Sequence, residues 1–130
     1  MQVGIVPSDL AASLHFYRDV LGFEQITRPA FKLPGAWLRF GKSELHLIHN
    51  PHGSFRADRA IDRDDLHFAL NVDDFEATIS ELKSKGFHED GDAGGALRML
   101  VDRKSLTGYP QVYLCDPDGN IIEINGAGRG

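Results

Sequence analysis

The chain carries two weakly similar copies of one sequence pattern, separated by a fixed offset of 65 positions. When residues 2–17 are placed over residues 67–82, identities are few but the apolar positions coincide, and Val3, for example, falls on Phe68. A Gly-Phe pair follows each copy. An internal repeat of this kind predicts two copies of one supersecondary unit, and it restricts the possible folds more than any single motif does.

The first copy is predicted to begin as a strand and to continue as a helix. Val3 and Ile5 alternate with a polar residue and a glycine, which is the period of a strand with one buried face. Ser8 is a favourable N-cap for the helix, and Gly22 is a favourable end. Between these two residues, apolar side chains recur at helical spacing, at Leu10, Leu14, Tyr17 and Leu21.

The second copy follows the same plan. Alternation of Leu66, Phe68 and Leu70 predicts its strand, Asp73 is the expected N-cap, and Gly86 is the expected helix end. The apolar stripe of this helix consists of Phe75, Ile79 and Leu82.

The remainder of each copy is predicted to form strands. Residues 23–29 continue as a strand after the first helix, and each copy then ends in a hairpin. The turn of the second hairpin, Asp-Pro-Asp-Gly at 116–119, is a strong turn signal, and Gly41-Lys42 forms the turn of the first. The predicted hairpin strands are 36–41 and 44–50 in the first copy, and 110–115 and 120–125 in the second.

The expected fold is therefore α+β, with two copies of strand–helix–strand–strand–strand in one domain, 1–130. Module one covers about 1–50 and module two about 64–126, with the helix of each packed on one face of a mostly antiparallel sheet. Residues 51–63 are polar without an apolar period and are expected to be the linker. Residues 90–108, which contain Gly-Asp-Ala-Gly-Gly, are predicted to form a long loop.

Composition excludes several classes of partner and compartment. The 14 Lys and Arg residues against 19 Asp and Glu give a net charge of −5, and no basic run occurs, so nucleic acid and anionic membranes are not expected partners. No apolar run approaches the length of a membrane span, and no secretory leader opens the chain. The single cysteine, Cys115, cannot form an intramolecular disulfide, which favours a reducing compartment. We expect a cytoplasmic protein.

Four polar residues occupy equivalent positions in the two copies. The offset places Gln2 opposite His67, and His46 and Glu123 both lie in the middle of the last strand of their copy. Strand alternation directs all four away from the apolar face that the helices cover. Two imidazoles, a carboxylate and an amide oxygen suit a divalent ion such as Zn, Ni, Co, Mn or Fe(II), with positions left open for a substrate.

The chain resembles the vicinal oxygen chelate superfamily, which includes glyoxalase I, extradiol dioxygenases and bleomycin-binding proteins. The segments 8–24 (SDLAASLHFYRDVLGFE), 67–74 (HFALNVDD) and 112–125 (VYLCDPDGNIIEIN) carry this resemblance. It implies paired βαβββ modules that form a cupped sheet around a central site, with metal ligands from the first and last strands of each module. It also implies a homodimer, and the two modules that complete a sheet can come from one chain or from two.

The resemblance implies a glyoxalase I-like lyase or isomerase that acts on a small molecule with adjacent oxygens by metal-stabilised proton transfer through an enediolate or enolate. Glu123, as the carboxylate of the ligand set, is then the catalytic residue. Two alternatives remain open, an Fe(II) dioxygenase with His46, His67 and Glu123 as its triad, and a non-enzymatic protein that binds a drug such as bleomycin. Candidates for lining a substrate pocket are Trp37, Arg39 and Tyr113.

Overall fold

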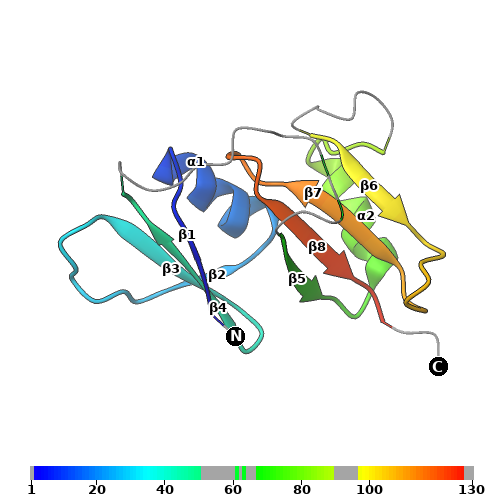
Figure 1. The fold of residues 1–130 in the computed structure, drawn as a ribbon, viewed down its shortest axis with the longest axis horizontal. Helices are drawn as coiled ribbons and strands as arrows, with labels where there is room; N and C mark the ends of the chain where they lie inside the picture. Colours follow the sequence, from blue (N-terminus) through cyan, green and yellow to red (C-terminus); the bar gives the residue numbers. More distant parts are fainter. Residues whose placement is uncertain (1, 51–60, 62, 64–66, 90–96, 128–130) are drawn as a thin grey trace. The chain divides into compact units, whose positions relative to one another are not determined.

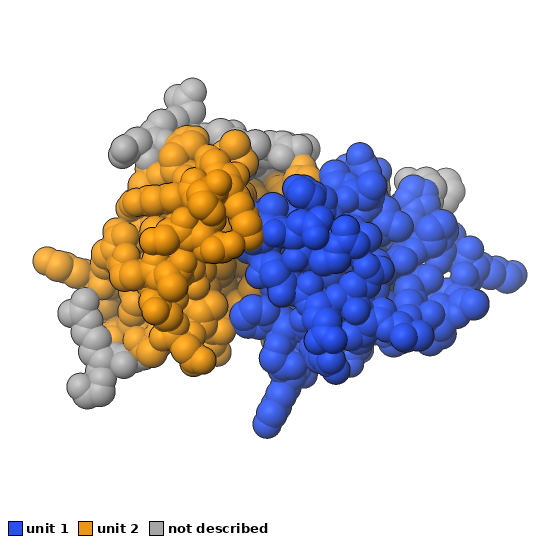
Figure 2. Space-filling view, turned by 180° about the vertical axis from the view of Figure 1, so that it is seen from behind, with its two compact units in different colours: residues 1–57 blue, residues 58–130 orange. Residues whose placement is uncertain are grey.

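The computed structural model describes residues 2–50, 61, 63, 67–89 and 97–127, which fall into two compact units (Figure 1). Figure 2 colours these units, residues 1–57 and residues 58–130, separately. Unit 1 contains β1 (Gln2–Ile5), α1 (Leu10–Leu14), η1 (His15–Val20), β2 (Glu24–Ile26), β3 (Gly35–Phe40) and β4 (Ser43–Ile48). Unit 2 contains β5 (His67–Asn71), α2 (Phe75–Ser84), β6 (Met99–Asp102), β7 (Gln111–Cys115) and β8 (Ile121–Asn125).

Each unit forms one four-stranded sheet, and the two sheets have the same topology. The strand order is β1-β4-β3-β2 in unit 1 and β5-β8-β7-β6 in unit 2. The first strand of each unit pairs in parallel with the last, and the other pairings are antiparallel. The α+β fold class and the mostly antiparallel sheets are therefore confirmed, and so is the prediction that both copies fold alike.

In both units one face of the sheet is apolar and buried. In unit 1, Leu38 on β3 and Leu47 on β4 are completely buried, together with Tyr17 of the helical segment. In unit 2, Leu114 on β7 and Ile122 on β8 are completely buried. Because successive side chains in a strand point to opposite faces, the residues between these positions lie on the other face, which is where the candidate site residues are found.

The two helices begin one residue later than the sequence predicts. Asp9 caps the first helix, and its carboxylate accepts a hydrogen bond from the Ala12 amide at 3.2 Å. Asp74 caps α2 in the same way, with the Ala77 amide donating at 3.0 Å. The predicted caps, Ser8 and Asp73, are therefore wrong. In both copies the residue that caps is the second of two adjacent residues able to do so, and the two capping residues are again 65 positions apart.

The first helix also changes its geometry along its length. After five α-helical residues, His15–Val20 form a π-helix, in which the Leu21 amide donates to the Phe16 carbonyl at 2.9 Å. The sequence predicts a single continuous helix here, because a π-turn leaves the apolar stripe nearly unchanged over so short a segment. The helix ends as predicted, at Gly22 with a φ of 79°, and α2 is followed by Gly86 with a φ of 97°.

The strand β6 lies within residues 90–108, which the sequence predicts to be a loop. Met99 is completely buried and pairs with Leu114 of β7, so the prediction is wrong for this segment. Four residues at the edge of a sheet carry too few alternating side chains to stand out beside a glycine-rich neighbour. That neighbour, at 91–95, and most of the predicted linker at 51–63 lie outside the described residues.

No helix in the parts of the chain that the structure describes is both long enough and apolar enough to cross a membrane.

The N-cap of α2 yields a direct stability prediction. Replacing Asp74 with alanine leaves the Ala77 amide without its side-chain acceptor, so we expect the free energy of unfolding to fall by about 1 kcal/mol. Asp73→Ala is the matched control and should have less than half that effect. Urea unfolding followed by circular dichroism measures both. Equal losses in the two variants would contradict the cap at Asp74.

Candidate functional site

The open face of the unit 1 sheet brings Gln2 and His46 onto adjacent strands. β1 and β4 run in parallel, with Gln2 beside Glu44 and Gly4 beside His46. Residues paired across a sheet point to the same face, so Gln2, Glu44 and His46 all lie on one side. The structure thus places these two sequence-predicted ligands on the same face, two positions apart along the paired strands.

The His46 imidazole is held between a ring and a carboxylate. It is nearly buried, and it stacks on Trp37 of β3 with ring centroids 3.9 Å apart and ring planes within 4° of parallel. Its Nε2 lies 3.0 Å from Oε1 of Glu44, to which it donates a hydrogen bond. Glu44 is a site residue that the sequence reasoning missed. The signal was present, because a residue two positions before His46 in a strand must share its face.

The face of the unit 2 sheet opposite Leu114 and Ile122 brings His67 and Glu123 together, beside a buried cluster of Tyr113, Cys115 and Ile121. His67 begins β5, and Glu123 lies in the middle of the adjacent parallel strand β8. The two side chains converge, with His67 Nε2 only 3.3 Å from Glu123 Oε1. Glu123 is largely buried at this point, with 12% of its side chain exposed. Among the described residues, His67 and Glu123 are thus two predicted ligands whose imidazole and carboxylate contact each other directly.

Tyr113 completes this cluster from β7, where it is the register partner of Glu123. Its hydroxyl is hydrogen-bonded to the Glu123 carboxylate, and its ring lies edge-on to His67 with centroids 6.1 Å apart. Burial raises the pKa of the Tyr113 phenol above its usual value, and the hydrogen bond to Glu123 raises it further.

Arg63 reaches the same face from the predicted linker, where the sequence gave no reason to look for a site residue. Its guanidinium lies over the Tyr113 ring, with Cζ 4.9 Å from the ring centroid. It also donates to Asp102 at 3.2 Å and to Gln111 at 3.3 Å. The interaction with Tyr113 opposes the increase in the pKa of the phenol, because a neighbouring cation favours the phenolate.

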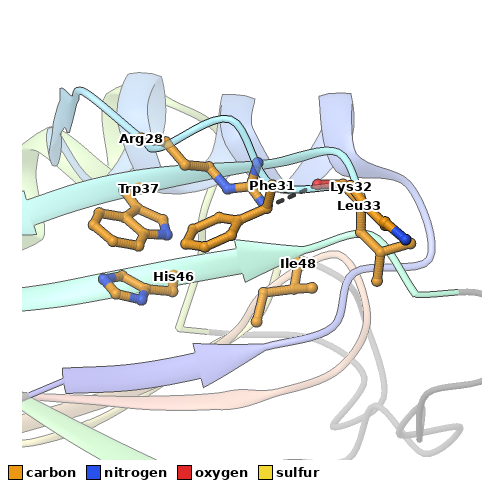
Figure 3. Close-up of a pocket in the computed structure, with 7 residues that line it drawn as sticks. All are labelled: Arg28, Phe31, Lys32, Leu33, Trp37, His46 and Ile48. Atoms are coloured by element: carbon orange, nitrogen blue, oxygen red, sulfur yellow. Dashed lines mark hydrogen bonds between the residues drawn. The ribbon is translucent and has the colours of Figure 1, made fainter.

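The three predicted pocket residues have different surroundings. Trp37 lines a pocket of about 430 Å³ in unit 1 (Figure 3). Arg39 shares the face of Trp37, but its guanidinium donates to Glu24 on β2 at 3.0 Å and it is not part of the pocket lining. Tyr113 lies in unit 2 beside Glu123. The pocket lining is Arg28, Phe31, Lys32, Leu33, Trp37, His46 and Ile48.

The donor atoms in each unit suit a divalent transition metal. Both units present an imidazole Nε2 within 3.3 Å of a carboxylate oxygen, at His46 with Glu44 and at His67 with Glu123. Imidazole nitrogen and carboxylate oxygen are ligands that zinc, nickel, cobalt and Fe(II) accept. Within the described residues, the side chains of His, Cys, Asp and Glu form no metal-binding group of three or more.

Comparison with known proteins finds a family and several relatives. The model of the Glyoxalase/Bleomycin resistance protein/Dioxygenase superfamily matches residues 2–124. "Glyoxylase I 4" of Arabidopsis thaliana is 28% identical over 124 residues, which cover 94% of this chain and 67% of the relative. "Virulence protein STM3117" of Salmonella typhimurium is 31% identical over 122 residues, which cover 91% of this chain and 76% of the relative.

A solved structure shares the fold. The crystal structure of a bleomycin-binding protein complexed with bleomycin superimposes with a TM-score of 0.69 at 21% identity, covering 98% of this chain and 97% of that one. At this level of identity the likeness concerns the fold alone.

The stacking of Trp37 on His46 can be tested by fluorescence, because Trp37 is the single tryptophan of the chain. His46→Ala removes the ring that covers one face of the indole, so we expect the emission maximum to move to longer wavelength as water reaches the excited indole. His49→Ala, three residues further on, is the matched control and should leave the spectrum unchanged. An unaltered spectrum in His46→Ala would contradict the stack.

Proposed function

The chain belongs to the Glyoxalase/Bleomycin resistance protein/Dioxygenase superfamily, and from this premise we propose that it is a metal-dependent enzyme of the glyoxalase I-like, lyase or isomerase type. Its substrate is a small molecule with oxygen atoms on adjacent carbons. The observation that carries this proposal is the convergence of His67 and Glu123, 3.3 Å apart on neighbouring strands, with the Tyr113 hydroxyl on the same carboxylate.

We assign Gln2, His46, His67 and Glu123 as the ligands of one divalent ion, with Glu44 as an additional acidic candidate. The assignment is supported by the sheet register, because each unit contributes its pair from its first and last strands, on one face of its sheet. Zn, Ni, Co, Mn and Fe(II) all suit this donor set. The two units that supply the ligands can belong to one chain or to two chains of a homodimer.

The proposed reaction is proton transfer next to a carbonyl group. Gln2, His46, His67 and Glu123 would hold a divalent ion, which when bound would supply Lewis acidity at the two substrate oxygens. Glu123, acting in turn as ligand and as base, removes the proton from the substrate carbon and returns it to the neighbouring carbon. Tyr113 holds the Glu123 carboxylate in place through its hydroxyl, and its largely buried ring limits the access of water to that carboxylate.

A non-enzymatic binding protein is the second candidate, and the unit 1 pocket favours it. Phe31, Trp37 and the His46 ring give this pocket an aromatic lining suited to a flat organic compound. Such a protein needs no metal. Bound metal therefore separates this candidate from the enzyme, and bound iron together with oxygen uptake would identify the dioxygenase.

Two general properties belong to the same proposal. We propose a homodimer, which size-exclusion chromatography with light scattering measures directly. We also propose that the protein acts in the cytoplasm, a location supported by its one cysteine, Cys115, which cannot form an intramolecular disulfide.

Metal content is the first test of the proposed function. The protein is purified without a metal-binding tag, loaded with each candidate ion, desalted and analysed by elemental mass spectrometry. We expect close to one ion per ligand set in the parent and background levels in His67→Ala and Glu123→Ala. His15→Ala is the control, because His15 pairs with Asp19 on the exposed side of η1. Absence of metal after loading with every ion would overturn the enzyme proposal.

The role of Glu123 is tested by Glu123→Gln, compared with the parent at equal metal occupancy. The amide keeps the shape of the side chain but cannot accept the proton, so we expect kcat to fall at least about 100-fold. The assay follows deuterium exchange from D2O into a 2-oxoaldehyde, supplied with and without glutathione, by NMR. Unchanged exchange in the variant would show that another group moves the proton.

A further inference from the structure

Aromatic and cationic side chains both line the unit 1 pocket. Trp37 is stacked on His46, and the Phe31 ring lies next to Trp37 with centroids 6.0 Å apart (Figure 3). Phe31 remains 55% exposed, which is unusual for a large apolar side chain. A pocket of about 430 Å³ with this lining is large enough for a small organic molecule to cover the exposed ring.

Arg28 is held in this lining without a described carboxylate partner. Its Nη2 donates to the Leu33 carbonyl at 2.8 Å, and its Cζ lies 5.0 Å from the Phe31 ring centroid. Arg28 also packs closely on Gly35, where a Cβ would clash with the Leu47 carbonyl oxygen and lie 3.0 Å from Arg28 Cζ. Arg28 Nε is buried and has no hydrogen-bond acceptor within the described part of the chain.

Several other arginines of this acidic chain are paired with carboxylates, although Arg98 also has a buried Nε without an acceptor among the described residues. Arg18, Arg39 and Arg103 each donate to a carboxylate. Arg28 and Lys32 line the pocket, and neither forms an ion pair with a described carboxylate. A partly buried cation without a counter-charge is unfavourable, and a ligand anion would relieve that cost.

We propose that this pocket binds a planar aromatic carboxylate, with the ring against Phe31 and Trp37 and the carboxylate near Arg28 and Lys32. The proposal names the substrate class of the site described above, and it rests on the proposed function only in treating the ligand as a substrate. Binding itself requires no metal and is measured separately from it.

The test uses isothermal titration calorimetry on EDTA-treated protein with two matched pairs of probes. We expect 2-naphthoate to bind at least about tenfold more tightly than 2-naphthamide, which has the same ring without the charge. We expect benzoate to bind more tightly than cyclohexanecarboxylate, which has the charge without the aromatic ring. Equal affinities within either pair, or no saturable binding of 2-naphthoate, would overturn the proposal.

Variants of Arg28 and Lys32 test whether these side chains cause the preference for the charged ligand. Arg28→Met and Lys32→Met should each weaken 2-naphthoate binding at least about threefold and leave 2-naphthamide nearly unchanged. Because Arg28 also holds the Leu33 carbonyl, Arg28→Lys is included, and it should retain most of the preference for the anion. Arg18→Met and Lys42→Met are matched controls outside the pocket lining, and a loss in them equal to that in the pocket variants would contradict the assignment.

Failure of the proposed enzyme activity and failure of the proposed anion binding give different results. Binding of 2-naphthoate in a protein that takes up no metal supports the pocket and overturns the enzyme. Metal uptake that depends on His67 and Glu123, without any preference for the anion, supports the enzyme and overturns the pocket assignment.

Discussion

Burial of one sheet face against a helix decides which residues of this protein are available for chemistry. Leu45 and Leu47 of β4 are buried in the unit 1 core, so His46 between them must lie on the opposite face. Ile122 and Ile124 of β8 impose the same orientation on Glu123. A shift of register by one residue would exchange the two faces and place the imidazole and the carboxylate in the core, which is why the apolar residues fix the geometry of the polar ones.

The two copies of the repeat agree best at positions where the backbone conformation restricts the residue type. The N-caps Asp9 and Asp74 are 65 positions apart, and both helices are followed by a glycine with positive φ, at Gly22 and Gly86. These positions satisfy amide groups or left-handed backbone geometry, for which few residue types suffice. The fold could therefore be predicted from one sequence because the helix N-caps, the glycines that end the helices and the buried apolar positions recur in both copies.

The sequence was less informative about the surroundings of the candidate residues. Alternation correctly places Gln2 with His46, and His67 with Glu123, on the face opposite the core. It cannot reveal Arg63, because no secondary-structure period relates a linker residue to the strand it covers, and Arg63 meets Tyr113 across 50 positions of sequence. The same limitation hides the pocket, in which Arg28 and Phe31 approach Trp37 through a loop whose path depends on tertiary packing.

The faces that carry the candidate residues differ in chemistry between the two units, although the unit 2 face also holds the buried cluster of Tyr113, Cys115 and Ile121. In unit 1, His46 is stacked on Trp37, and the neighbouring pocket combines aromatic rings with Arg28. In unit 2, the imidazole of His67 meets a carboxylate and a phenol. One framework can therefore serve different functions within a superfamily, since function depends on the residues placed on it. In this chain, the groups suited to recognising a flat anion and those suited to moving a proton lie on different copies of the repeat.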